Sequence, residues 1–161
     1  SASVGETLIA LKIEECEKKN LSFHEVVRQV EEYIEEQNTY FVLETLETLR
    51  KNGRLTGLKA IVATALNIKP VMGATPQGVI CQLGQARGIK KALVKMVDEV
   101  VKDVKRPEEK TLAISHCNCL ERAEAVKRMI LEKISPKKVI ILDTAGISSM
   151  YAADGGIIVV V

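Results

Sequence analysis

The stretch that decides the fold spans residues 110–142 and reads KTLAISHCNCLERAEAVKRMILEKISPKKVIIL. Its first and last apolar runs, residues 112–115 and 139–142, have the length and β-branched content of buried strands. Between them, residues 120–133 repeat apolar side chains at helical spacing. This order predicts a β-α-β unit, and the apolar run at residues 157–161 predicts one more strand. The sequence therefore indicates an α/β fold, a layered sandwich in which a mixed β-sheet packs with α-helices.

Helices and short strands alternate upstream of this unit. Ser22 with Glu25, and Asn118 with Glu121, have the spacing of capping boxes, and Gly53 has the position of a helix-ending glycine. We expect helices at about residues 6–19, 22–34, 45–52, 58–66 and 88–104, and strands at about 40–43, 68–72 and 79–81. Residues 145–156 are rich in small side chains and predict a long loop between two strands.

Length and composition describe an ordinary globular chain. The 161 residues suit one domain or slightly more, and 47% of them are hydrophobic while 27% are charged. Lysine and arginine number 23 against 21 acidic residues, and aromatic residues make up only 3%. A nucleic-acid binder normally carries a basic face and stacking aromatic rings, so we do not expect nucleic acid as a partner.

The two ends of the chain and its cysteine content bear on compartment and domain organisation. Four cysteines are too few for a disulfide scaffold, and the chain shows neither a secretory signal nor an apolar run of the ~20 residues that span a bilayer. We therefore expect a cytoplasmic protein without stable membrane insertion. Because the chain lacks an initiator methionine and enters a helix at once, we expect that some part of the protein upstream of it is missing. Residues 1–38 would be a helical segment leading to that missing part, and residues 39–161 the α/β domain.

A cluster of metal-ligating side chains occurs at His116, Cys117 and Cys119. Zinc takes nitrogen and sulfur ligands, but a structural zinc site usually has a second ligand pair, and none matches here. Cys119 at a helix start is alternatively a reactive thiol. We favour a structural interpretation, in which a strand end is followed by a helix start, and we expect no metal. Asp143 is open to two interpretations, a catalytic group of an α/β enzyme or, as we favour, a turn-forming or capping residue.

Two arginines are candidates for binding an anion. Arg54 lies in a short link after one helix, and Arg87 lies directly before another. The planar guanidinium group suits a carboxylate or a phosphate, although either arginine also fits a plain surface charge. The loop at residues 145–156 follows a strand, where loops of α/β folds commonly line ligand crevices.

Several ordered motifs resemble the DegV family of bacterial fatty-acid-binding proteins. Residues 41–55, FVLETLETLRKNGRL, resemble a strand–helix–GGRI signature of that family, and residues 66–71, LNIKPV, resemble its LNIKPI segment. Residues 87–93, RGIKKAL, resemble its RGRKKAL helix start, and residues 151–157 stand where the family has HTGPGAL. Residues 1–5 resemble its S-x-S-x-G lead into a long helix. The similarity extends over essentially the whole chain.

The resemblance implies the C-terminal domain of a two-domain lipid clamp. Family members hold a long-chain fatty acid, which we take as roughly C14–C18, between two α/β domains. By motif position Arg54 matches an arginine near the fatty-acid carboxylate and Arg87 an arginine near the head group. Tyr151 takes the place of the family's histidine, and a phenol is neutral at a pH where imidazole can protonate. Possible acyl-chain lining is provided by Ile61, Val62, Ala65 and Leu66, which fit an ordinary core equally well.

The function that follows from the resemblance is a lipid carrier rather than an enzyme. The carrier would present the carboxylate of its fatty acid to a separate fatty acid kinase and would need no cofactor. Two other classes stay open. One is an α/β enzyme for a small phosphate or carboxylate, with Arg54 and Arg87 as anion clamps and Asp143 or Cys119 in the chemistry. The sequence shows no phosphate loop or nucleophile–base pair for such an enzyme. The other is a purely structural interaction domain.

Overall fold

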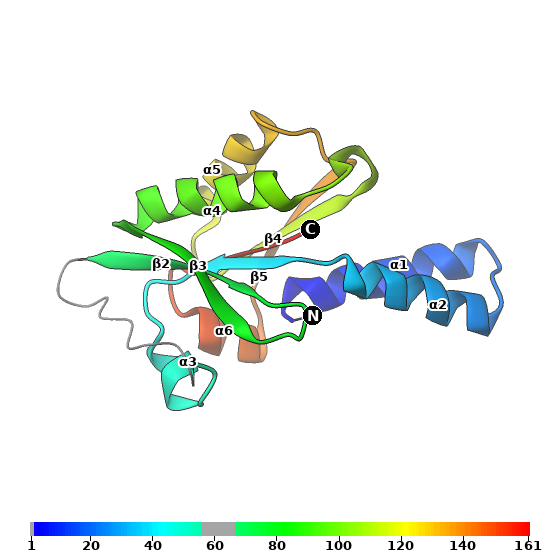
Figure 1. The fold of residues 1–161 in the computed structure, drawn as a ribbon, viewed down its shortest axis with the longest axis horizontal. Helices are drawn as coiled ribbons and strands as arrows, with labels where there is room; N and C mark the ends of the chain where they lie inside the picture. Colours follow the sequence, from blue (N-terminus) through cyan, green and yellow to red (C-terminus); the bar gives the residue numbers. More distant parts are fainter. Residues whose placement is uncertain (1, 56–66) are drawn as a thin grey trace.

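The computed structural model describes residues 2–55 and 67–161 and places their strands in one mixed sheet (Figure 1). The strands are β1 (Thr39–Val42), β2 (Ile68–Ala74), β3 (Ile80–Arg87), β4 (Thr111–His116), β5 (Lys138–Asp143) and β6 (Ile157–Val160). Their spatial order is β3-β2-β1-β6-β4-β5. Strands β4 and β5 are parallel, and every other neighbouring pair is antiparallel. The predicted α/β fold with a mixed sheet is confirmed.

Two long helices cover one face of the sheet, α4 (Ile89–Asp103) and α5 (Leu120–Leu131) (Figure 1). The apolar stripe that spacing predicts for α4 is buried, from Ala92 to Val100. It packs against strand side chains of the same face, among them Tyr40, Val42, Val71, Leu112, Ile114 and Val159. The crossover from β4 through α5 to β5 is the predicted β-α-β unit. This face therefore holds the main core of the described chain.

On the opposite face of the sheet, three helices each cover a part of the surface. Helix α1 (Val4–Lys18) packs Val4 and Leu8 against Ala113 and Val160. Helices α3 (Glu47–Lys51) and α6 (Gly146–Ala152) lie together beneath the other end of the sheet. They bury an apolar cluster of Phe41, Leu43, Leu49, Met72 and Ala152. Among the described residues, no helix has the length and apolar content that a membrane crossing requires.

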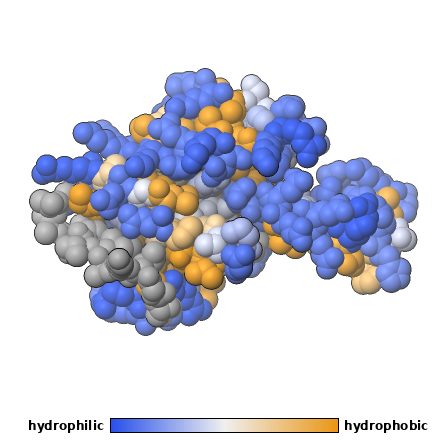
Figure 2. All heavy atoms as spheres, viewed as in Figure 1, coloured by the Kyte–Doolittle hydropathy of each residue, from blue (hydrophilic) through white to orange (hydrophobic). Residues whose placement is uncertain are grey.

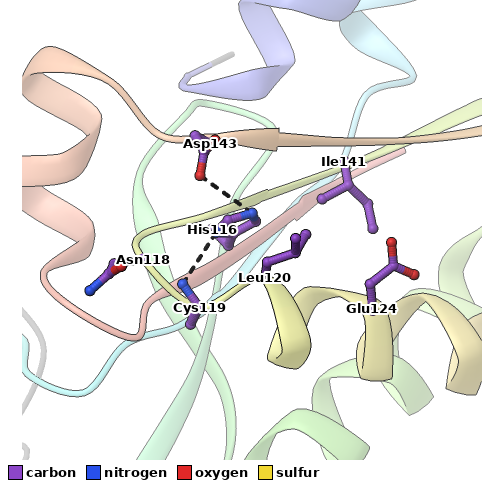
Figure 3. A pocket seen from close by; sticks show the side chains of 7 residues that line it. All are labelled: His116, Asn118, Cys119, Leu120, Glu124, Ile141 and Asp143. Atoms are coloured by element: carbon purple, nitrogen blue, oxygen red, sulfur yellow. Dashed lines mark hydrogen bonds and ion pairs between the residues drawn. The ribbon is translucent and has the colours of Figure 1, made fainter.

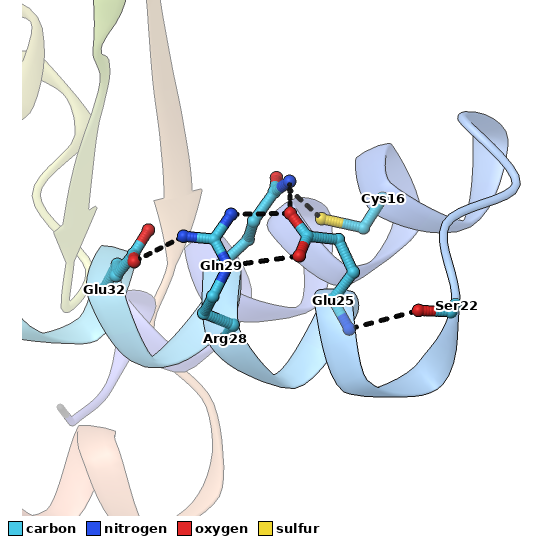
Figure 4. A network of polar contacts seen from close by, with 6 residues as sticks. All are labelled: Cys16, Ser22, Glu25, Arg28, Gln29 and Glu32. Atoms are coloured by element: carbon cyan, nitrogen blue, oxygen red, sulfur yellow. Dashed lines mark hydrogen bonds and ion pairs between the residues drawn. The ribbon is translucent and has the colours of Figure 1, made fainter.

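Helix α2 (Phe23–Glu35) pairs with α1 in a hairpin that extends away from the sheet (Figure 1). The Ser22 hydroxyl accepts the Glu25 backbone N–H at 3.4 Å, as the capping-box spacing predicts. The Glu25 carboxylate, however, accepts hydrogen bonds from Arg28 at 2.5 and 3.1 Å and from Gln29 at 2.8 Å (Figure 4). Arg28 also donates to Glu32 at 2.6 Å. A chain of charge-assisted bonds therefore follows one side of α2.

Glu25 is expected to titrate far below an ordinary glutamate. The hydrogen bond from Arg28 is the main cause, followed by that from Gln29, and together they lower the pKa of Glu25 from 4.5 to about 2. Because the folded-state pKa is the lower one, the contact stabilises helix α2 above about pH 4.5 and is lost as the pH falls toward 2. A pH titration of the Glu25 carboxyl carbon by NMR should show this low midpoint. Arg28→Ala should move the midpoint up toward 4.5, and an unchanged midpoint would contradict the assignment.

Two elements differ from the sequence expectation. Strand β3 continues to Arg87, whereas the pattern predicts a strand only at residues 79–81, because pairing with β2 compensates for the weak strand preference of Gln82, Gly84 and Gln85. The expected loop at residues 145–156 contains the helix α6. Its seven residues lack a clear helical stripe, and packing of Ala152 and Tyr151 into the apolar cluster under the sheet stabilises it. The helix expected at residues 58–66 lies outside the described residues.

Candidate functional site

Arg54 and Tyr151, far apart in the sequence, meet on the face of the sheet that carries α3 and α6. The guanidinium carbon of Arg54 lies 5.8 Å from the centroid of the Tyr151 ring. The arginine is held by its own segment, since its backbone N–H donates to Leu49 O at 2.9 Å and its Nη1 donates to Asn52 O at 2.8 Å. Gly53 permits the tight turn between them at φ +68°. The geometry places the guanidinium of Arg54 over the ring of Tyr151, at cation–π distance.

The surroundings of this pair are apolar on one side and open on the other. Tyr151 is half-buried and packs against the cluster under the sheet, whereas Arg54 is exposed. On α6, Ile147 is 69% exposed and Met150 is 50% exposed. Figure 2 shows apolar side chains reaching the surface in the lower part of the body, where Figure 1 places α3 and α6. Donors to a carboxylate therefore lie beside apolar surface, the pairing that an amphipathic acid requires.

A network of three charged side chains, Glu44, Lys69 and Arg122, lies against the turn at Gly155, which follows α6. Lys69 Nζ lies 2.7 Å from Glu44 Oε2, and Arg122 Nη2 lies 3.0 Å from Glu44 Oε1. Arg122 Nη1 donates to the carbonyl oxygen of Gly155. Burial opposes ionisation of Glu44, but the hydrogen bond and charge of Lys69, with the charge of Arg122, outweigh it and hold the pKa of Glu44 below its usual value. Glu44 is therefore a carboxylate shared between two cations.

The same turn is tied to the end of β4. Gly155 N–H donates to Cys117 O at 2.9 Å, and Cys117 N–H donates to Gly156 O at 3.0 Å. The side-chain amide of Asn118 donates to Asp154 Oδ1 at 2.9 Å. The capping role predicted for Asn118 is wrong, because Asn118 has φ 53° and lies before the helix, whose N-cap is Cys119 without a side-chain cap. Asn118 instead fastens the turn between α6 and β6.

Of the other predicted site residues, Arg87 is described and lies elsewhere in the fold, and four lie outside the described residues. Arg87 is the exposed last residue of β3, opposite Ile68 of β2, and no described residue forms an ion pair with it. Its place at the sheet edge does not bring it into contact with Arg54 or Tyr151. The four residues expected to line an acyl chain lie outside the described residues; they are Ile61, Val62, Ala65 and Leu66.

A hollow of about 440 Å³ opens beside the carboxyl ends of β4 and β5 (Figure 3). It is lined by His116, Asn118, Cys119, Leu120, Glu124, Ile141 and Asp143. His116 is only 4% exposed, and its Nε2 lies 3.5 Å from Asp143 Oδ1 while its Nδ1 accepts the Cys119 backbone N–H at 3.3 Å. Both ring nitrogens therefore have partners. Asp143, for which the sequence favours a turn-forming or capping role, is the last residue of β5 and lies opposite this histidine on the neighbouring strand β4.

Cys119, which lines this hollow, lacks the features of a reactive thiol. Burial raises the pKa of the Cys119 thiol, and its sulfur lies 3.6 Å from Gly156 O as a donor. A raised pKa favours the unreactive thiol over the thiolate. Within the described ranges, no three His, Cys, Asp or Glu side chains are grouped so that they could hold a metal ion.

Sequence comparison identifies the family. A family model described as "Uncharacterised protein, DegV family" matches residues 1–161, the whole chain. The chain belongs to the DegV family. A DegV domain-containing protein of Clostridium perfringens is 32% identical over 147 residues, and one of Streptococcus pyogenes serotype M1 is 35% identical over 152 residues. These matches cover 91% and 94% of this DegV chain but 50% and 53% of the relatives, so it spans about half of their length.

Solved DegV structures share the fold closely. A DegV family protein from Ruminococcus gnavus, refined with vaccenic acid, is 65% identical with a TM-score of 0.97, covering 100% of this chain and 57% of that one. The Fatty Acid Kinase (Fak) B3 protein of Streptococcus pneumoniae, loaded with linoleic acid, is 32% identical with a TM-score of 0.85. A DegV family protein from Eubacterium eligens, loaded with heptadecanoic acid, is 27% identical with a TM-score of 0.84. The last two matches cover 95% and 96% of this DegV chain and 54% and 55% of theirs.

Proposed function

We propose that the protein carrying this chain binds a long-chain fatty acid and that Arg54 and Tyr151 hold its carboxylate. The observation that carries the proposal is the meeting of these two side chains beside the exposed apolar surface of α6. The fatty acids present in the related DegV structures support it. A guanidinium donates two parallel hydrogen bonds to a carboxylate, and a phenol adds a third donor.

The hydrocarbon supplies most of the affinity in this account. Each buried methylene contributes about 0.8 kcal/mol, whereas a carboxylate gains only by finding donors that replace water. We propose that Ile61, Val62, Ala65 and Leu66 line the acyl chain and that an upstream domain closes the slot from the other side. Residues 1–38 would lead to that domain, and residues 39–161 would form the half of the clamp that carries Arg54.

The bound acid is proposed to be a cargo rather than a substrate of this protein. Its carboxylate would be presented to a separate fatty acid kinase, as the name of the Streptococcus pneumoniae relative suggests. We place this step in the cytoplasm as part of the same proposal. Arg87 is proposed to act at the head-group side of that complex. The side chains at Arg54 and Tyr151 provide positive charge and a hydrogen-bond donor, which suit binding and orientation.

Titration calorimetry with oleate and methyl oleate tests this proposal on the intact protein that carries the chain. The ester keeps the hydrocarbon but removes the negative charge, so we expect it to bind at least about 10-fold more weakly. Equal affinity for acid and ester would contradict a carboxylate site at Arg54. Binding of acetate or phosphate with no gain from a longer chain would favour the small-anion enzyme instead.

A further inference from the structure

We infer that Glu44, Lys69 and Arg122 are positioning residues that set the placement of Arg54 against Tyr151. The inference rests on the proposed function, because it assigns these three side chains a role in holding the fatty-acid carboxylate. None of the three faces the ligand in this account. They act through the two chain segments that carry Arg54 and Tyr151.

Glu44 anchors the segment that carries Arg54. It is the second residue beyond β1, and Lys69 of β2 holds it twice, at its carboxylate at 2.7 Å and at its backbone carbonyl at 2.8 Å. The chain then enters α3, where Leu49 is buried and its carbonyl accepts the Arg54 N–H. The short helix α3 therefore connects the anchored Glu44 to Arg54, so the position of Glu44 fixes that of Arg54.

Arg122 anchors the segment that carries Tyr151. Its Nη1 donates to Gly155 O, in the turn that follows α6. Gly155 has φ +83°, and a Cβ there would lie 2.7 Å from Arg122 Nη1 and 3.1 Å from Glu44 Cγ. The turn therefore lies directly against the network, with no room for a side chain between them. This turn therefore connects Tyr151 to Arg122, so the position of Arg122 fixes that of Tyr151.

One guanidinium joins the two halves. Arg122 bonds Glu44 through Nη2 and Gly155 through Nη1, so its fork spans the end of β1 and the start of β6. A lysine at this position keeps the charge but has no rigid fork to hold both partners. Arg122→Lys should therefore let Arg54 and Tyr151 move relative to each other while it preserves the local charge.

A double-mutant cycle on oleate affinity in the intact protein tests the inference. We expect Arg122→Lys to weaken binding about 10-fold in the wild-type background but by less than about 2-fold when Tyr151→Phe is already present, since coupled residues are not additive. Arg128→Lys, at an exposed position on the same helix, is the matched control and should change affinity less than about 2-fold. An equal loss in both backgrounds, or no loss, would overturn the positioning role.

A measurement without ligand separates this inference from the proposed function. The ring signals of Tyr151 in a ¹³C-tyrosine NMR spectrum, assigned with Tyr151→Phe, should shift in Arg122→Lys and stay in place in Arg128→Lys. An unmoved Tyr151 signal in Arg122→Lys would refute the positioning role even if oleate binds. Wild-type protein that binds no oleate, with a shifted Tyr151 signal, would instead refute the proposed function and leave the network as a structural feature of the turn, overturning its role in carboxylate binding.

Discussion

Replacing Arg54 with glutamine is expected to weaken oleate binding by the intact protein about 10- to 100-fold. A hydrogen bond to a charged group contributes about 1.5–3 kcal/mol, and each 1.4 kcal/mol is a factor of ten in affinity. The substitution removes the positive charge from the Arg54–Tyr151 pair while leaving the apolar surface of α6 untouched. Competition against a fluorescent fatty acid gives the affinity of each variant.

Arg50→Gln is the matched control for that substitution. Arg50 lies in the last turn of α3, one turn from Arg54, and is also exposed. It should change oleate affinity by less than about 2-fold, since removing an exposed charge away from a site has small effects. If the two variants lose the same affinity, the effect of Arg54 is general charge attraction, and the specific carboxylate contact is contradicted.

The largest expected loss of stability follows truncation of Ile114. This side chain is 0% exposed in β4, between Ile141 of the parallel β5 and Val159 of the antiparallel β6. Ile114→Ala should lower the free energy of unfolding by about 2–5 kcal/mol, because it removes buried carbon and leaves a cavity that rigid strands cannot close. Urea unfolding of the intact protein measures the change.

Leu131→Ala gives the comparison for Ile114. Leu131 ends α5 and is 45% exposed, so its truncation should cost no more than about 0.5 kcal/mol. A loss from Ile114→Ala as small as that from Leu131→Ala would contradict the assignment of β4 to the centre of the core.

The fold could be predicted best where the spacing of apolar residues within one segment is enough to identify a strand or a helix. The β4–α5–β5 unit was predicted because two apolar runs flank a long helical period, and α4 because its apolar stripe is strong. Strand β3 is longer than the sequence pattern predicts, and helix α6 lies where that pattern predicts a loop. Glutamine and glycine in β3, and the small residues of α6, carry weak local preferences, and contacts with β2 and with the apolar cluster decide their structure.

The residues of the candidate site could be predicted in part, through the family resemblance, and their role in binding stays a proposal. Arg54 was recognised by its position after a helix-ending glycine, and Tyr151 by the motif it replaces, and the structure brings them together. The network of Glu44, Lys69 and Arg122 was missed because its members are single charges in three separate segments. Lys69, in an otherwise apolar strand, was the one local signal that a partner had to exist.

The most direct test of the lipid-carrier account is mass spectrometry of organic extracts from the intact protein, purified without added lipid. The account predicts close to one long-chain fatty acid per protein in the wild type and a markedly lower content in Arg54→Gln, with Arg50→Gln like the wild type. Wild-type protein that contains no fatty acid, and takes up none when palmitate or oleate is added, would contradict it.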